Sequence, residues 1–363
     1  MDRFESRRGN LRKLIAKAGA EAMLVSNFTN VTYLTGFTGD DSFLLVTPKE
    51  QLIISDSRYT TQLEQECPGL KVHIRANITP ILDATVQVLK GAKVGSLAIE
   101  GDSMTVSEHA KLVENAKGTT ITVAPGWIEQ LRQIKDKHEI DETRLAARQA
   151  EKAFRVLSYS LRPEMTEKEA ADLLEYQMRL NGAKGAAFQS IIGVGANAAL
   201  PHYRPGNVKI GEDDFVLIDW GATAKHYRSD LTRVLVTGKL SPKLERVYGV
   251  VLKAQMAAID AIRPGVTGRE VDQVARGIIT DAGFGKQFGH GLGHGLGLDI
   301  HEAPRLNAAN DRPLEVGMIV TVEPGIYLPG WGGVRIEDDI LVTKSGHEVL
   351  TNLPKELDAM IVA

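Results

Sequence analysis

The segment FVLIDWGATAKHYRSDLTRVLVTG (residues 215–238) contains two apolar runs, each of which carries an acid. Asp219 lies near the end of a run with the composition of a buried strand, and Asp230 opens the next run eleven positions later. A carboxylate is costly to bury unless a partner neutralises it. If a short turn through Lys225 and His226 joins the two strands, the carboxylates lie side by side. Either one of them is then protonated or a cation lies between them.

Two further acids interrupt apolar runs closer to the C-terminus. Glu323 ends the run GMIVTVEPG, and Glu337 lies inside GVRIEDDILV. The sequence thus predicts four acids in four strands. A strand edge with its acid pointing into water explains any one of them well. It explains four of them poorly, and a histidine-rich segment nearby weakens that explanation further.

That segment is FGHGLGHGLGLDIHEAP (residues 288–304), which contains His290, His294 and His301. Its glycines, at 289, 291, 293, 295 and 297, allow close backbone approach and positive φ where needed. A lone histidine is more often a structural hydrogen-bond donor than a ligand. The cluster favours ligands, but it does not say which histidine binds.

The donor types indicate which metals would suit such a site. Four carboxylates and one imidazole suit two divalent ions of fairly hard character, such as Mn²⁺ or Co²⁺. A set without cysteine argues against a structural zinc site. Two such ions roughly 3.5–4 Å apart can share a bridging water and lower its pKa.

The rest of the chain predicts two domains, with boundaries at 1–128 and 129–363. In the first, strands and helices alternate, which predicts an α/β layer. Its expected strands are 22–26, 43–47, 52–55, 96–99 and 120–123, and its expected helices are 8–19, 59–66, 79–90 and 107–117. The charged segment 130–152, with its Ala and Leu content, predicts a long helix exposed on one face, which we interpret as a solvated linking helix.

The second part predicts an α+β domain, with helices beside a mainly antiparallel sheet. The expected helices are 138–161, 166–181, 242–262 and 268–281, and the expected strands are 215–220, 231–236, 318–323 and 334–342. Gly193, Gly195 and Ala198 match a dinucleotide-binding pattern. Pro201 and Pro205 would break the helix that such a pattern must open, so we reject it.

Composition excludes several classes of function. With 43% apolar residues, 25% charged residues and a net charge of −3, the chain has no nucleic-acid footprint. No apolar stretch approaches the ~18 residues of a membrane span. The N-terminus lacks a signal peptide's apolar centre, and the single cysteine, Cys67, fits a reducing compartment. We therefore expect a cytoplasmic protein.

At these residues the chain resembles the pita-bread metallopeptidases, the family of aminopeptidase P, prolidase and methionine aminopeptidase. The motifs Asp-x₁₀-Asp, His-x₆-His-Glu, Glu-Pro-Gly and Arg-x-Glu all occur in order. The resemblance implies two divalent ions, with Mn²⁺ foremost and Co²⁺ or Zn²⁺ as alternatives. The implied metal ligands are Asp219, Asp230, His294, Glu323 and Glu337, of which Asp230 and Glu337 would bridge both ions.

The resemblance extends to the N-terminal part and to the substrate pocket. NVTYLTGFTG (30–39) and SDSRYTTQLEQE (55–66) are similar to the N-terminal domain of creatinase and of proline-directed peptidases. Many relatives carry Ser-Asn at the Asp40-Asp41 position, a minor departure. VGANAALPHYRP (194–205) resembles a stretch whose histidine lines the pocket. The implied pocket histidines are His202, His290 and His301, and Tyr327 and Arg335 would orient a metal-bound carboxylate.

The function implied is hydrolysis of the Xaa-Pro bond at the N-terminus of peptides, in the manner of aminopeptidase P. His301 and His202 would stabilise the transition state, and Glu323 would pass a proton to the leaving group. The first alternative is an Xaa-Pro dipeptidase, or prolidase, whose motifs are nearly the same. A creatinase-like hydrolase and a non-catalytic interaction module are weaker alternatives, because both lose ligands that this chain keeps. The expected assembly is a homodimer.

Overall fold

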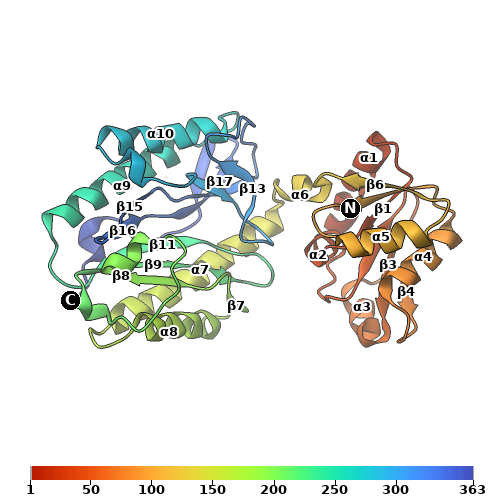
Figure 1. The fold of residues 1–363 in the computed structure, drawn as a ribbon, viewed down its shortest axis with the longest axis horizontal. Coiled ribbons are helices and arrows are strands. Elements are labelled where there is room, and N and C mark those ends of the chain that lie inside the picture. The colour runs from red at the N-terminus through yellow and green to blue at the C-terminus, as the bar shows by residue number, and fades with distance from the viewer. Residues whose placement is uncertain (1, 363) are drawn as a thin grey trace. The chain divides into compact units, whose positions relative to one another are not determined.

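A computed structural model describes residues 2–362 and divides into two compact units, which meet between Arg132 and Gln133. Figure 1 shows the elements of both units along the chain. Within the described residues, no helix combines the length and the apolar character that crossing a membrane requires.

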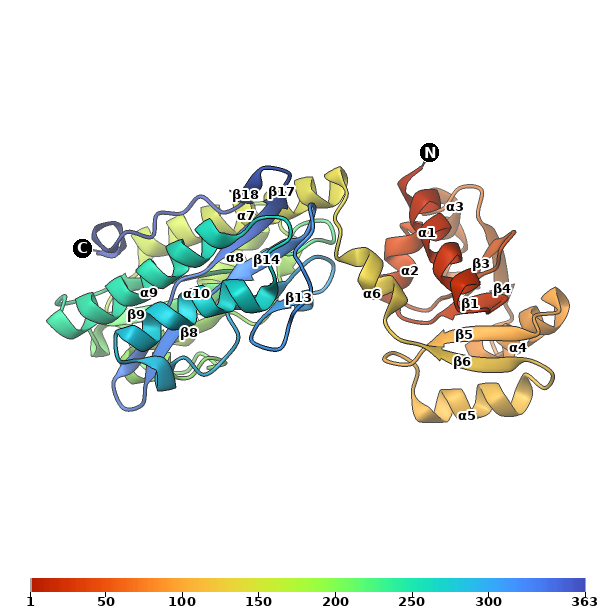
Figure 2. The same cartoon turned by 90° about the horizontal axis from the view of Figure 1, so that it is seen from above.

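The N-terminal unit is built on a six-stranded mixed sheet in the order β4-β3-β2-β1-β5-β6. All four residues of the central strand β1 are buried, so both faces of the sheet are covered there. On one face α4 and α5 pack through Leu89 and Leu112 against the sheet (Figure 2). The strands are β1 (Ala22–Val25), β2 (Phe43–Val46), β3 (Gln51–Asp56), β4 (Lys71–Arg75), β5 (Ser96–Glu100) and β6 (Thr120–Ala124), and the α-helices are α1 (Arg3–Lys17), α2 (Phe28–Thr35), α3 (Thr60–Glu66), α4 (Ile81–Ala92), α5 (Val106–Asn115) and α6 (Trp127–Arg132).

Two elements of this unit were not expected from the sequence. Helix α2 is rich in β-branched and aromatic residues, which favour strands. Asn27 overrides that preference by accepting hydrogen bonds from the backbone of Thr29 and Asn30, and Gly36 ends the helix at a φ of 82°. Strand β4 is an edge strand with no fully buried residue, so its apolar signal is weak.

The C-terminal unit combines antiparallel sheets with helices, as expected for an α+β domain. Strands β8, β9 and β11 form one sheet, and β13-β12-β14-β17-β18 form a second. The helices are α7 (Lys137–Ser160), α8 (Glu167–Leu180), α9 (Pro242–Ala261) and α10 (Gly268–Asp281). The strands are β7 (Gly185–Ala186), β8 (Ile191–Val194), β9 (Phe215–Trp220), β10 (Ala222–Thr223), β11 (Leu231–Val236), β12 (Gly293–Gly295), β13 (Glu302–Leu306), β14 (Ile319–Val322), β15 (Gly325–Leu328), β16 (Gly332–Arg335), β17 (Asp338–Thr343) and β18 (Gly346–Val349).

The four helices form two pairs, each packed on a different part of the strands (Figure 1). Helix α8 packs on β7 and β8, whereas α9 packs on β14, β15 and β16. One continuous apolar core joins both pairs to the strands. The rejected dinucleotide pattern follows β8 and opens only a short 3-10 helix (Gly195–Ala199).

The helix expected over 138–161 is confirmed as α7, but the expectation that 130–152 is one helix serving as a solvated link is wrong. The segment contains a break, because α6 ends at Arg132 and α7 begins after Asp136, whose side chain caps it. Helix α7 then contributes Ala150, Phe154 and Leu157 to the core of the C-terminal unit. In the sequence of α7, charged residues alternate with apolar residues that recur at helical spacing and form one buried face.

The stacked pair Phe154 and Trp220 gives a test of this packing. Their ring centroids lie 4.3 Å apart, and the Trp220 indole also donates a 3.0 Å hydrogen bond to the Ala150 carbonyl. We expect Phe154→Ala to lower the free energy of unfolding of this unit by about 3–5 kcal/mol, measured by urea titration. The control is Tyr159→Ala on the same helix, because Tyr159 is 92% exposed. Equal effects of the two substitutions would contradict the assignment of α7 to the core.

Candidate metal centre and substrate cavity

Asp219 lies near the end of β9, where the sequence placed it, whereas the single strand expected over 334–342 is interrupted at Glu337. Asp230 directly precedes β11, Glu323 directly follows β14, and Glu337 separates β16 from β17. Strand β14 stops at Glu323 because the next residue, Pro324, has no N–H to donate to a sheet. The acids therefore stand at strand ends, where the backbone is free to turn the side chains inward.

The three-stranded and the five-stranded sheets of the C-terminal unit meet at Glu337. Its backbone N–H donates to the Thr232 carbonyl at 3.2 Å, an isolated bridge between β11 and the five-stranded sheet. In the neighbouring ladder Thr232 pairs with Asp219 on β9. Asp219 and Glu337, which are far apart in sequence, are thus brought to one junction, and Asp230 lies two positions before Thr232.

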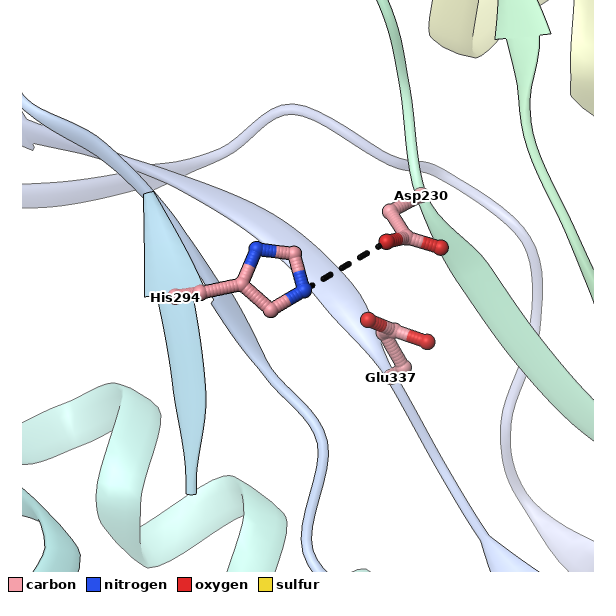
Figure 3. Close-up of side chains that lie close together, drawn as sticks. All are labelled: Asp230, His294 and Glu337. Carbon is pink, nitrogen blue, oxygen red and sulfur yellow. Dashed lines mark ion pairs between the residues drawn. The ribbon is translucent and has the colours of Figure 1, made fainter. Parts of the chain in front are cut away.

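Asp230, His294 and Glu337 converge at this junction, and all three are buried. One ligand atom from each lies within 4.8 Å of the other two. Figure 3 shows the imidazole and the two carboxylates facing a common space. His294 Nε2 lies 3.7 Å from Asp230 Oδ2 and 3.3 Å from Glu323 Oε1, so Glu323 borders the same space.

Strand β12, which carries His294, packs closely against β13 and β14 because glycines flank the histidine. A Cβ on Gly293 would meet the Thr321 carbonyl oxygen at 2.1 Å, and one on Gly295 would meet that of Ala303 at 2.3 Å. The expected close approach is confirmed, but none of the five glycines of this segment has a positive φ. His294 Nδ1 lies 2.9 Å from the Gly295 carbonyl, which can only accept. Nδ1 therefore holds the proton, and Nε2 presents its lone pair to the acids.

Asp219 is held by Arg335, which is buried. Arg335 Nη2 donates to Asp219 Oδ2 at 2.5 Å, and Arg335 Nη1 donates to the Tyr327 hydroxyl at 2.7 Å. The Tyr327 hydroxyl lies 2.9 Å from His290 Nε2. Among residues 2–362 the other Asp219 oxygen, Oδ1, is buried without a hydrogen-bond partner. A metal ion is the kind of partner that such an orphaned carboxylate oxygen suits.

Burial dominates the electrostatics of the cluster. It raises the pKa of Asp230 and Glu337 well above the usual range, and neighbouring carboxylates raise both further. Burial also raises the pKa of Glu323 to about 7 and raises the pKa of Asp219 despite Arg335. It lowers the pKa of His294 to about 3. One guanidinium does not balance four acids, so the donor set fits divalent cations.

The cluster forms part of the wall of a cavity of about 930 Å³. His202, His290 and His301 all line this cavity. The His301 ring meets the His294 ring edge-on at 4.5 Å between centroids. His290 has both ring nitrogens engaged, because Nδ1 also lies 2.8 Å from the Gly291 carbonyl. The structure thus gathers all of the site residues expected from the sequence around one cavity.

Several residues of the site were missed at the level of sequence. The Thr232 hydroxyl donates to Glu337 Oε2 at 2.6 Å, and the Thr321 hydroxyl donates to Glu323 Oε1 at 3.1 Å. Asp339 accepts a 3.1 Å hydrogen bond from the Asp230 backbone. A usable signal was present, because side chains two positions apart share one face of an extended chain. Thr321 is two positions from Glu323, and Asp339 is two positions from Glu337.

Replacing Glu323 by Gln tests the burial of these acids in metal-free protein. A raised pKa in the folded state stabilises the protein below the unfolded value of 4.5 and loses that contribution as pH rises through about 7. Glu323→Gln, which has no charge to bury, should match the thermal midpoint of the unsubstituted chain at pH 5 and exceed it at pH 8. Saturating Mn²⁺ should remove that advantage.

The matched control is Glu164→Gln, because Glu164 is exposed. Its thermal midpoint should differ from that of the unsubstituted chain by the same amount at both pH values. If the change in thermal midpoint caused by Glu323→Gln is also the same at pH 5 and pH 8, the assignment of a buried carboxyl with a raised pKa is contradicted.

Two family models match the chain. The model of metallopeptidase family M24 matches residues 141–344, and the creatinase/prolidase N-terminal domain matches residues 7–134. The Xaa-Pro dipeptidase of Pyrococcus horikoshii is 36% identical over 358 residues, which covers 98% of this chain and 100% of that protein.

Solved structures give the same result. An Xaa-Pro dipeptidase from Bacillus anthracis is 39% identical with a TM-score of 0.95, and the match covers 99% of each chain. An X-Pro aminopeptidase from Thermotoga maritima is 36% identical with a TM-score of 0.90, covering 99% of this chain and 100% of that one. The two-part fold expected from the resemblance is confirmed. The chain belongs to metallopeptidase family M24, the pita-bread hydrolases, and carries the creatinase/prolidase N-terminal domain ahead of its catalytic domain.

Proposed function

We propose that this chain is a metal-dependent exopeptidase that hydrolyses the Xaa-Pro bond at the N-terminus of peptides. The observation that carries the proposal is the convergence of Asp230, His294 and Glu337 in the wall of the large cavity. Similar proteins named as Xaa-Pro dipeptidase and X-Pro aminopeptidase support the specificity for proline.

Asp219, Asp230, His294, Glu323 and Glu337 would hold two divalent ions. Oxygen-rich donors with one imidazole suit Mn²⁺ best, with Co²⁺ or Zn²⁺ as alternatives. The ions supply a nucleophilic hydroxide at neutral pH by lowering the pKa of water. Within this set, Arg335 and Thr232 fix the orientation of Asp219 and Glu337.

The remaining steps fall to side chains in the cavity. Glu323, which borders both the ligand cluster and the cavity, would pass a proton to the leaving nitrogen. Burial and the Arg305 charge lower the pKa of His301, so the neutral imidazole can donate to a developing oxyanion. His202 would bind the substrate from another part of the wall. His290 would act mainly by supporting Tyr327, since both of its nitrogens are engaged.

The second candidate is the narrower activity of an Xaa-Pro dipeptidase. Arg204 and Arg305 line the cavity and are exposed, and no side-chain hydrogen bond or ion pair within residues 2–362 engages either guanidinium. A guanidinium suits the free carboxylate that a dipeptide carries directly after proline. Longer peptides would place an amide there instead.

The oligomeric state stays a prediction. Relatives with this N-terminal domain imply a homodimer by resemblance, and we propose the same assembly for this chain.

Paired tripeptides test the specificity for proline. The bond to proline is a tertiary amide, and its ring gives the cavity an apolar surface to recognise. Loss of such contacts costs ~1–3 kcal/mol, so kcat/KM should be about 10–200-fold lower for Ala-Ala-Ala than for Ala-Pro-Ala. A chelator should abolish both rates and Mn²⁺ should restore them. Equal rates on the two peptides, or preferential release of N-terminal methionine, would refute the proposal.

A second pair of substrates separates the dipeptidase from the aminopeptidase. If Arg305 binds the carboxylate, kcat/KM should be roughly 10–100-fold lower for Ala-Pro-amide than for Ala-Pro, the scale of one charged hydrogen bond. Arg305→Gln should bring the two values together, and Arg204→Gln shows whether that residue shares the task. Arg312→Gln, at an exposed arginine that does not line the cavity, is the control. Equal rates on acid and amide, with ready cleavage of longer peptides, would favour the aminopeptidase.

A further inference from the structure

The segment that carries His202, residues 194–206, is tied at both ends to one buried carboxylate. We propose that Glu167 is a positioning residue that holds His202 in the cavity wall by clamping this segment. The inference rests on the proposed function, since it assigns a role within the same site. Nothing in the sequence motifs around the metal ligands points to Glu167.

The clamp uses both oxygens of Glu167, which is 0% exposed. Oε1 accepts from the Val194 backbone N–H at 2.8 Å and from Asn197 Nδ2 at 2.9 Å. Oε2 accepts from the Tyr203 hydroxyl at 2.7 Å and from the Gly206 backbone N–H at 3.0 Å. One oxygen thus holds the start of the 194–206 segment and the other holds its end.

The position of Glu167 stabilises this arrangement. It is the first residue of α8, where the unpaired N–H groups of the helix favour a negative charge. Four donors satisfy the two oxygens, so the buried charge is fully hydrogen-bonded. The α8 backbone adds to the anchor, because the Lys168 N–H donates to the Gly206 carbonyl at 3.0 Å.

His202 depends on this clamp because its ring has no hydrogen-bond anchor of its own among the described residues. The pocket histidine His290 and the candidate metal ligand His294 each bond a ring nitrogen to the carbonyl of the next residue. For His202, no hydrogen bond to the imidazole is found within residues 2–362. Its place in the cavity is therefore set by the backbone of the 194–206 segment. Tyr203 and Arg204, which also line the cavity, lie on the same clamped stretch.

A double-mutant cycle separates positioning from general stability. Glu167→Gln keeps the size of the side chain but turns an amide N–H₂ toward two donors. We expect kcat/KM on Ala-Pro to fall about 10–100-fold, the scale of a misplaced reacting group. In a His202→Ala background the same substitution should change kcat/KM by less than about twofold, because the two effects share one cause. Metal content, measured by elemental analysis, should be unchanged.

The control is Glu169→Gln on the same first turn of α8. Glu169 is exposed and bonds only within the capping box with Thr166. It should leave kcat/KM unchanged. If Glu167→Gln fails to fold, Tyr203→Phe removes one donor of the clamp and should show a smaller loss with the same coupling to His202. Additive losses, or equal losses from Glu167→Gln and Glu169→Gln, would overturn the proposal.

Hydrogen–deuterium exchange gives a readout that needs no activity. Glu167→Gln should speed exchange in peptides that cover residues 194–206, because the amide nitrogen replaces the acceptor of either the Val194 or the Gly206 N–H. Glu169→Gln should not change exchange there. Unchanged exchange in this segment would also overturn the clamp. If the unsubstituted chain cleaves no Xaa-Pro peptide, the proposed function fails, and the exchange result still decides the clamp.

Discussion

The arrangement of the catalytic unit follows from the confinement of four carboxylates to one small buried volume. Asp219, Asp230, Glu323 and Glu337 are all desolvated, and their charges repel one another. A fold can hold such a group only if cations and fixed hydrogen-bond donors surround it. Arg335 supplies one fixed charge, and threonine hydroxyls hold individual oxygens. The negative charge that Arg335 and the hydroxyls leave unbalanced is what gives the site its capacity to bind cations.

The strands show how this constraint shapes the backbone. The acids stand at or near strand ends, close to the junction at which the two sheets meet through Thr232 and Glu337. The interior of a ladder would hold each side chain perpendicular to its sheet. At a strand end the chain can turn, and residues from separate sheets can approach one volume. The glycines around His294 serve the same end by removing the bulk that would hold β12 away from its neighbours.

The metal-ligand candidates were predictable because each is chemically out of place in an apolar run, and because the spacing resembles a known family. The residues that hold the ligand candidates and the cavity wall in place have no such feature in the sequence. A threonine such as Thr232 is ordinary in a strand, and Glu167 resembles any acid in the first turn of a helix. Helix α2 was missed because its composition favours a strand, while a cap at Asn27 decides the outcome. Roles of this kind depend on partners distant in sequence, which no local pattern reports.

Buried acids also hold the loops around the cavity. Asp272 pairs with Arg276 on α10, and Arg276 donates to the carbonyls of Phe288 and His290. The buried Lys135 donates to Glu302, the residue that follows His301 in sequence. Charge pairs and charge-assisted hydrogen bonds therefore support the walls of the cavity alongside its apolar contacts. Such supports are directional, which suits a cavity whose polar edges must keep fixed orientations.

The row of side chains from Arg335 through Tyr327 to His290 has a built-in polarity. Arginine can only donate and the Gly291 carbonyl can only accept, so the two ends of the row have fixed roles. While the imidazole is neutral, Nδ1 donates to the Gly291 carbonyl and the Tyr327 hydroxyl donates to Nε2. Burial lowers the pKa of His290 to about 4, so that ordering persists through the neutral range. The row therefore keeps one order of donors and acceptors through the neutral pH range. That order fixes Arg335, which holds Asp219 toward the candidate metal site.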